Sequence, residues 1–460
     1  IPTFTPGVSR IQDWLPVRGA EVDLHTTSVY VNDRWQLNNR WTFNLGARYE
    51  NYNPDSTQAG IVTPKSSAFV PRLGATFDVK GDGQWILQAT YGHYAGKQSE
   101  TQFADNTNVG NPNLIVYQYA GPAGEGVGFA PGYDLANYTV IGGSFPVNNV
   151  FLDSGLKTPI TKEWTVQAGT RLGRKGDIKL VYADRHTTNI LEDFITLAQG
   201  KTTVAQNGVT FGTFDNSFIT NSDIPHRKYQ ALDGIFNYRV SDKWTVSANY
   251  THQFKNEGNF EGEAGNQPGN YSIIGDRPEF YSEARHYPTG DLAQFEGDRL
   301  RAFSTYDIGL GKAGRASLGV LYRFDSPGKF SFIATNVPVS AIQKAANPGY
   351  ANPPTLNTNL YFGGRGTGSF AASHLFDFAL NYELPVFRTA RPWFKAELRN
   401  AFNSQSLIQS NTSITVDPNS PLDALGLPTG FIKGANFGKD TSNAQTPIPR
   451  EYRFSVGFRF

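Results

Sequence analysis

The chain has 460 residues, and its 41 Lys and Arg balance 40 Asp and Glu, so formal charge gives no reason to propose a nucleic-acid partner. Cysteine is absent, which excludes disulfides, thiolate catalysis and cysteine-ligated zinc or iron–sulfur sites. No run of about 18 apolar residues occurs, which excludes a transmembrane helix, whereas a β-barrel needs strands of only roughly 9 to 11 residues.

Apolar and polar residues alternate in segments of strand length. In residues 41–50, Trp41, Phe43 and Leu45 fall on one face, and Thr42 and Asn44 fall on the other. The same period of two recurs in residues 163–172, 244–251, 316–324, 376–384 and 394–402. Aromatic residues gather at the strand ends, as in the girdles of membrane barrels. The pattern predicts an all-β fold, an antiparallel transmembrane β-barrel.

Short and long connections alternate along the chain. We expect short turns near residues 37–40, 80–83, 173–176, 240–243, 311–314 and 386–390. We expect long loops at about 53–67, 96–157, 197–226, 256–298, 326–369 and 404–449. Bacterial outer-membrane barrels have short periplasmic turns and long extracellular loops. Residues 1–21 are therefore predicted to end an extracellular loop, and residues 22–460 to hold the barrel strands.

The predicted strand number is odd. We count about thirteen strands, whereas complete bacterial barrels have an even number. We therefore expect upstream strands to be missing from this chain.

The last ten residues, EYRFSVGFRF, form the sharpest single motif. Tyr452, Phe454, Val456, Phe458 and Phe460 share one face, and the chain ends on an aromatic residue. Such an edge strand would be an aggregation hazard in a soluble protein unless another strand covered it. The motif resembles the terminal signal by which outer-membrane proteins are recognised for barrel assembly.

Four segments, residues 28–52, 157–173, 227–254 and 451–460, resemble the barrel of TonB-dependent receptors, especially the Oar-type group. The resemblance implies a plugged barrel of about 22 strands. It also implies contact with the TonB complex and energised transport of a bulky substrate across the bacterial outer membrane. Neither a plug nor a TonB box is visible before the first strand. An N-terminal region or a second chain is expected to supply them.

Charged residues on the lumen side of the predicted strands are candidates for contact with a plug. They are Arg48, Arg171, Arg239, Arg301, Arg323, Glu383, Glu397 and Arg399. The alternative is that inward charges only pair with each other and keep the interior hydrated.

Aromatic residues in the loop at 96–157 are candidates for ligand binding, because long ordered loops commonly carry function. They are Tyr117, Tyr119, Phe129, Tyr133 and Tyr138. The alternative is that these side chains only pack together as a lid.

No enzyme or nucleotide motif is present. The seven histidines show neither HExxH nor zinc-site spacing, and the glycine clusters at 121–132 and 363–369 lack the flanking elements or the lysine of a nucleotide loop. No cofactor is expected. Two sets of loop residues are candidates for calcium, because their side chains carry oxygen ligands: Asp417, Asn419 and Asp423 in one loop, and Glu257, Glu261 and Glu263 in another.

The leading hypothesis is an outer-membrane TonB-dependent receptor or transporter for a large ligand such as a peptide, a protein or a glycan. Its expected partners are membrane lipid, the TonB complex through the missing part, and an extracellular ligand or surface protein. The alternatives are a surface-binding or structural barrel without active transport, and a passive porin-like channel. An outer-membrane enzyme is the weakest alternative.

Overall fold

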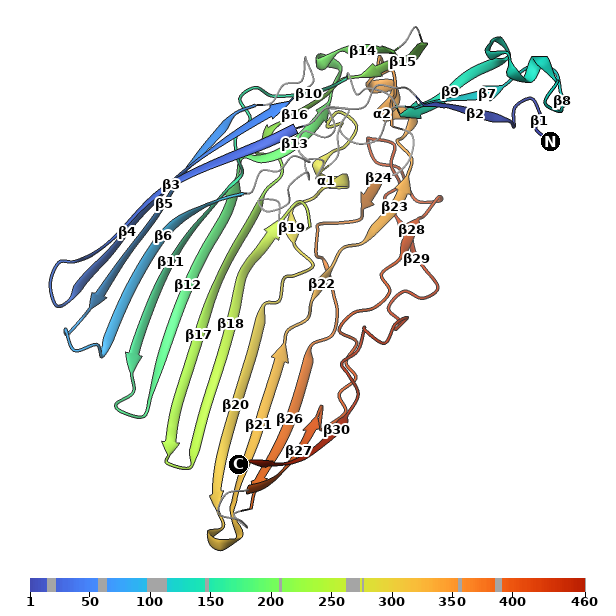
Figure 1. Ribbon diagram of the computed structural model, residues 1–460. Coiled ribbons are helices and arrows are strands. Elements are labelled where there is room, and N and C mark those ends of the chain that lie inside the picture. Colours follow the sequence, from blue (N-terminus) through green and yellow to red (C-terminus); the bar gives the residue numbers. More distant parts are fainter. Residues whose placement is uncertain are drawn as a thin grey trace.

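A single large antiparallel sheet dominates the computed structural model (Figure 1). The structure describes residues 1–14, 22–56, 64–96, 114–144, 149–206, 209–261, 274, 277–354, 358–384 and 391–459. Thirteen strands of this sheet follow one another in chain order, and the short β19 (Gly290–Asp291) is added beside β18. The strands are β3 (Val22–Gln36), β4 (Trp41–Ser56), β5 (Ser66–Asp78), β6 (Trp85–Ala95), β11 (Ile160–Arg171), β12 (Gly176–Thr188), β17 (Arg227–Ser241), β18 (Trp244–Gly258), β20 (Asp298–Gly309), β21 (Arg315–Asp325), β26 (Ser373–Glu383), β27 (Arg391–Arg399) and β30 (Glu451–Arg459).

Neighbouring strands pair antiparallel as hairpins, which confirms the predicted fold class. Only residues 37–40 separate β3 from β4, and residues 242–243 separate β17 from β18. The connections at the opposite end are long. Strands of 9 to 16 residues are long enough to cross the apolar part of a membrane.

The register gives the sheet one apolar and one polar face. Trp41 lies opposite Phe77, and Leu45 lies opposite Leu73, so the apolar residues of adjacent strands share a face. These side chains have no protein cover: Leu45 is 44% exposed and Val456 is 77% exposed. An uncovered apolar face of this extent faces lipid in a transmembrane barrel.

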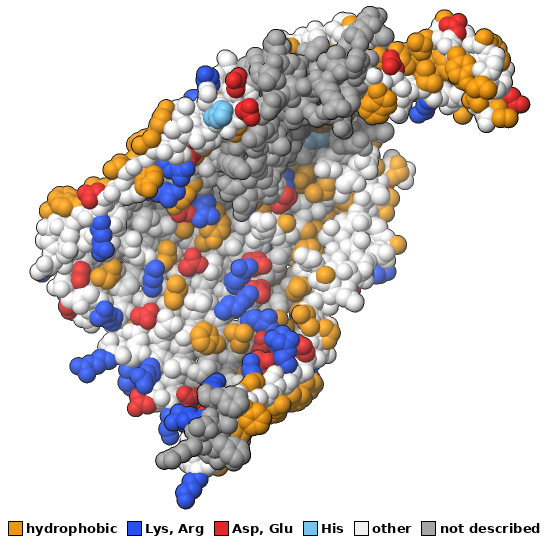
Figure 2. Space-filling view, viewed as in Figure 1, with side chains coloured by type: hydrophobic (Ala, Val, Ile, Leu, Met, Phe, Trp, Pro, Cys, Tyr) orange, Lys and Arg blue, Asp and Glu red, His pale blue; other side chains and the backbone are white. Residues whose placement is uncertain are grey.

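The other face is polar. Lys, Arg, Asp and Glu side chains are spread over the strands, with hydrophobic residues mainly at the rims (Figure 2). Thr90 and Thr165 meet there with their hydroxyl oxygens 2.7 Å apart, from directly opposite positions on β6 and β11. We call this face the lumen face.

Helical segments are few and short in the part of the chain that the structure describes. They are α1 (Glu283–His286), α2 (Ala341–Ala346), η2 (Ala130–Tyr133), η3 (Leu135–Asn137), η4 (Leu197–Gln199) and η6 (Gly311–Ala313). Within the described ranges, no helix has the length and apolar content needed to cross a membrane.

The first residues of the chain fold together with the loop after β6. We call this the N-terminal unit. It contains β1 (Thr3–Phe4), β2 (Arg10–Trp14), β7 (Leu114–Tyr119), β8 (Gly124–Glu125) and β9 (Tyr138–Ser144). Its core is Phe4, Tyr119 and Tyr138. Figure 1 shows it beyond the loop end of the sheet, with the N-terminus near its tip.

The remaining long loops carry small sheets of their own. Their strands are β10 (Val150–Leu152), β13 (Ile190–Ile195), β14 (Lys201–Gln206), β15 (Val209–Asp215), β16 (Ser217–Ser222), β22 (Lys329–Phe330), β23 (Ile333–Val337), β24 (Thr358–Tyr361), β25 (Gly368–Ser369), β28 (Ile414–Val416) and β29 (Phe431–Lys433). One core contains Leu152, Leu191 and Ile219, and a second contains Leu360 and Leu427. The second core joins two loops that lie far apart in the sequence.

Candidate functional site

Ion pairs run across the lumen face of the last strands. Arg301 on β20 lies directly opposite Arg323 on β21, an arrangement that destabilises a sheet unless both charges are compensated. A guanidinium nitrogen of Arg301 lies 2.6 Å from Asp325, and one of Arg323 lies 2.8 Å from Asp377. Each arginine therefore has its own carboxylate.

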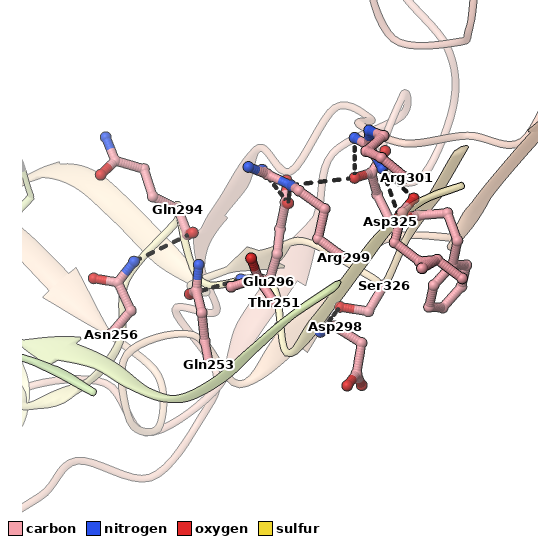
Figure 3. A network of polar contacts seen from close by, with 12 residues as sticks. Thr251, Gln253, Asn256, Gln294, Glu296, Asp298, Arg299, Arg301, Asp325 and Ser326 are labelled. Carbon is pink, nitrogen blue, oxygen red and sulfur yellow. Dashed lines mark hydrogen bonds and ion pairs between the residues drawn. The ribbon is translucent and has the colours of Figure 1, made fainter. Parts of the chain in front are cut away.

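The same pairs are tied to the loop that enters β20 (Figure 3). Arg299 donates through Nε to Glu296 at 2.9 Å and lies 3.4 Å from Asp325, so it bridges loop and strand. The backbone N–H of Glu296 in turn donates to the Gln253 side chain at 3.3 Å. This network holds the upper end of the lumen wall and the base of the loop as one polar layer.

A cavity of 830 Å³ opens beside this layer. Its wall side contains Arg323, Asp377 and Arg399, and its loop side contains Ile408 and Pro447. The volume lies within the range of small-molecule pockets, roughly 300–1,000 Å³. The cavity combines charged and apolar contacts at the junction of the barrel wall and the loops.

The other predicted lumen residues are also placed on this face or at its lower rim. Arg48 pairs with Glu50 at 2.6 Å, and Glu397 pairs with Lys395 at 2.7 Å. Arg399 meets Glu451 at 3.5 Å.

The remaining three predicted lumen residues lie near the short turns. Glu383 lies 3.1 Å from Arg459, Arg239 meets Asp242 at 3.2 Å, and Arg171 has no ion-pair partner among the described residues. Mutual pairing thus accounts for most of these charges, and contact with a plug stays a prediction.

Two arginines, the buried Arg365 and the partly buried Arg285, join the long loops. Arg365, 5% exposed, donates to the carbonyls of Pro288 at 3.0 Å and Asn259 at 2.7 Å, and it pairs with Glu261 at 2.7 Å. Arg285 in α1 donates to the carbonyls of Tyr361 and Pro428 and pairs with Asp423. These two side chains connect the loops after β18, β21 and β27.

A fourth loop joins the same assembly. Both carboxylate oxygens of the buried Asp215 accept from backbone N–H groups, those of Ala351 at 2.9 Å and Asn352 at 2.8 Å. The Tyr350 hydroxyl lies 3.1 Å from the carbonyl of Ile195 and 2.8 Å from Glu279. Burial, followed by the Glu279 carboxylate, raises the pKa of Tyr350. We call the four linked loops the loop cap.

Sequence analysis did not predict the pairings between these cap residues. Arg285 and Asp423 are 138 residues apart, and Arg365 and Glu261 are 104 apart. No local spacing relates such partners. The available signal was only the presence of arginines in loops that are otherwise polar and glycine-rich.

The predicted ligand-binding aromatics have different surroundings. Tyr119 is completely buried and Tyr138 is 8% exposed, and their hydroxyls donate to the carbonyls of Pro122 and Gly132. These two residues are core residues and not surface contacts, which corrects the prediction for them. Tyr133, 58% exposed, is open to a ligand, and Tyr117 and Phe129 are partly covered.

Asp417 and Asp423, which were proposed as calcium ligands, form hydrogen bonds with other groups of the protein. Asp423 uses one carboxylate oxygen for the N–H groups of Leu425 and Leu427 and the other for Arg285. Asp417 accepts from the N–H of Asn419 in a tight turn. Among the described residues, no group of three or more acidic or histidine side chains is arranged for a metal ion. Asp423 is thus not available as a ligand, and loop calcium stays a prediction without a site.

The residues of the predicted assembly signal lie on the apolar face of β30. Tyr452, Phe454 and Phe458 are 60–66% exposed and point away from the lumen. Phe460 lies outside the described residues. The strand has the outward aromatic face that the motif predicts, and its role in assembly stays a prediction.

Comparisons with known proteins agree with this architecture. Residues 2–119 match the family model described as TonB dependent receptor-like, beta-barrel. The chain is 22% identical over 332 residues to the TonB-dependent transporter Oar of Myxococcus xanthus, which covers 65% of this chain and 30% of that protein.

Two solved structures also match this chain over part of their length. The ferric citrate transporter FecA matches at a TM-score of 0.47 with 12% identity, over 96% of this chain and 45% of its own. BauA, the ferric preacinetobactin receptor of Acinetobacter baumannii, matches at 0.44 with 13% identity, over 96% and 44%. The chain spans less than half the length of these relatives. The chain is thus a β-barrel protein of the bacterial outer membrane that is similar to TonB-dependent receptors.

Proposed function

We propose that this chain is the barrel part of a receptor that captures a large ligand on its loop cap and passes it through the outer membrane with energy from TonB. The relationship to TonB-dependent receptors supports the energy source. The ligand class, a peptide, a protein or a glycan, rests on the loops of this chain.

The main support for a large ligand is that four long loops are linked into one cap. Arg365 and Arg285 connect three of them, and the buried Asp215 connects the fourth. Loops that only closed a pocket over a small molecule would not need such mutual links along their length. A linked cap presents a broad preorganised surface, which suits a ligand that contacts several loops at once.

The lumen face suits passage of a polar ligand. Its charges are compensated by neighbours of opposite sign, so the wall is polar without a strong net field. We further propose that these pairs contact a plug, and that Tyr133 contributes to ligand binding at the N-terminal unit.

A second candidate is a surface-binding barrel without transport. The N-terminal unit favours it, because this unit has its own aromatic core and stands beyond the loop end of the sheet (Figure 1). A passive channel is the third possibility.

The test uses the intact protein in outer membranes of cells. Fluorescein-labelled peptides and dextrans of graded size serve as probes, and periplasmic accumulation is measured with and without a protonophore. Cells that lack the protein give the background.

Energised transport predicts accumulation of at least one probe that the protonophore abolishes. Accumulation that the protonophore leaves unchanged would indicate a passive channel. Binding at the surface without accumulation would favour the surface-binding candidate.

A further inference from the structure

A row of basic side chains crosses the lipid-facing side of four adjacent strands. Lys162 on β11 lies directly opposite His93 on β6 and His186 on β12. His186 lies directly opposite Lys228 on β17. Four neighbouring strands thus place a basic residue at the same height, close to their loop ends. At about 4.8 Å between strands, the row is roughly 14 Å long.

The face of this row follows from its neighbours. The Tyr91 hydroxyl lies 2.6 Å from His93 Nε2, and Tyr91 lies opposite Trp164 on the apolar face. The residues next in sequence point the other way. Glu163 pairs with Arg185 on the lumen face, and the Arg185 guanidinium lies over the ring of Tyr229.

The basic side chains of the row, unlike most arginines of the lumen face, have no carboxylate partner among the described residues. No carboxylate forms an ion pair with Lys162, His186 or Lys228 among the residues that the structure describes, whereas most lumen arginines have one. Lys162 and Lys228 carry the permanent charge of the row and lie on either side of His186, so an anion placed over the row would meet two ammonium groups.

Two carboxylates lie near the row, and both have other partners. Glu257, opposite Lys228, lies 2.8 Å from the Lys255 ammonium. Asp184 is 8% exposed and accepts from the Gln230 side chain. Neither carboxylate has an ion pair with any of the four basic residues of the row.

An aromatic band lies just below the row on the same face. Trp164 packs against Tyr182 with ring centroids 5.5 Å apart, and Tyr182 packs against Phe254 at 6.2 Å. Aromatic bands mark the boundary between acyl chains and headgroups. The basic row therefore lies at headgroup depth in the outer leaflet, where it can meet anionic headgroups.

We propose that His93, Lys162, His186 and Lys228 bind the phosphorylated headgroup of an outer-leaflet lipid, while the aromatic band below packs against its acyl chains. Lysine ammonium groups bind phosphate as point charges, and the imidazoles add hydrogen-bond donors. A lipid fits better than free phosphate, because only a lipid uses both the charged row and the apolar band. The site is separate from the loop cap and does not depend on transport.

The test compares lipid binding by the intact protein in detergent. Diphosphorylated lipid A is titrated into the wild type, the double variant Lys162→Gln/Lys228→Gln and a control, Lys243→Gln/Lys312→Gln. The control removes the same charge from exposed positions at the short-turn end. Native mass spectrometry counts the bound lipids, and the same series is repeated with dephosphorylated lipid A.

We expect the double variant to bind diphosphorylated lipid A roughly thirtyfold more weakly than the wild type, and the control to match the wild type. The variant Lys162→Arg/Lys228→Arg keeps the charge and should restore binding. Heat-modifiable migration on gels verifies that each barrel is folded, and the single variant Lys228→Gln replaces the double variant if that one is not. Unchanged binding by the folded glutamine variant, or equal binding of the dephosphorylated lipid by the wild type, would overturn the proposal.

Discussion

Arg365 is a buried cation whose hydrogen bonds all cross between loops. Its guanidinium supplies the two carbonyls of Pro288 and Asn259, and the ring of Tyr361 covers it at 5.0 Å. A buried carbonyl that loses its donor cannot turn to water without opening the loops. The cap should therefore respond to this residue more than to any exposed ion pair.

We predict that Arg365→Ala destabilises the cap by about 3 kcal/mol, because the variant leaves the buried backbone carbonyls and the carboxylate that Arg365 contacts without their donor. Hydrogen exchange of the backbone at residues 256–261 and 358–369 measures the effect. Arg391→Ala is the control, since Arg391 is 56% exposed in its pair with Glu383 and such pairs contribute at most about 1 kcal/mol. Equal protection in both variants would show that the cap does not depend on Arg365.

His286 gives the cap a dependence on pH. Burial lowers the pKa of His286 to about 4 from its ordinary 6.5, against the opposing effect of the Ser282 carbonyl that its Nδ1 contacts. The unfolded segment takes up a proton near pH 6.5 and the folded one only near pH 4. The stability that the neutral His286 gives to the folded segment is therefore complete above pH 6.5, and it is lost progressively as the pH falls toward 4.

We predict that the segment around α1 loses about 3 kcal/mol of local stability between pH 7 and pH 4, at 1.36 kcal/mol for each unit of pKa. Hydrogen exchange at Glu283–Tyr287, corrected for intrinsic rates, follows the change. His286→Gln has no imidazole to titrate and should flatten the profile in this window. A profile in the variant as steep as that of the wild type would assign the pH dependence to other groups.

The two faces of β30 should respond differently to charge. Phe454 faces away from the lumen and is 66% exposed, whereas Ser455 faces inward, opposite Lys395. We predict that Phe454→Glu costs about 2 kcal/mol in lipid and lowers the yield of assembled barrel, while Ser455→Glu is tolerated beside Lys395. The heat-modifiable fraction in outer membranes is the measurement. Equal assembly of the two variants would contradict the assignment of the faces.

Strands and loops differ in how far the sequence predicts them. The alternation of Trp41, Phe43 and Leu45 repeats over many residues, and one apolar face is enough to determine a strand and its orientation. The loop elements depend on partners far away, as when β2 pairs with β7 about a hundred residues later. Tyr119 and Tyr133 look alike in sequence, yet one is core and the other is surface, because neither lies in a periodic pattern.

The whole sheet has two edges within the described residues, β3 and β30. Both strands run from the loop end to the short-turn end, because twelve antiparallel pairings separate the first strand of the sheet from the thirteenth. Direct closure of β30 on β3 would therefore make a parallel pair, in contrast to the antiparallel pairing of bacterial barrels. Open edges are not stable in lipid, so each edge requires a partner strand. An odd number of further strands restores antiparallel closure.

We predict that β3 and β30 are not neighbours in the native membrane. The chain has no cysteine, so paired cysteines can be introduced without background. Val31→Cys with Ala47→Cys joins directly opposite positions on β3 and β4 and should cross-link on oxidation, because such positions have Cβ atoms about 5 Å apart. Val31→Cys with Val456→Cys should give no intramolecular disulfide. A disulfide in the second pair would mean that the barrel closes through a parallel seam, and the prediction of additional strands would then be wrong.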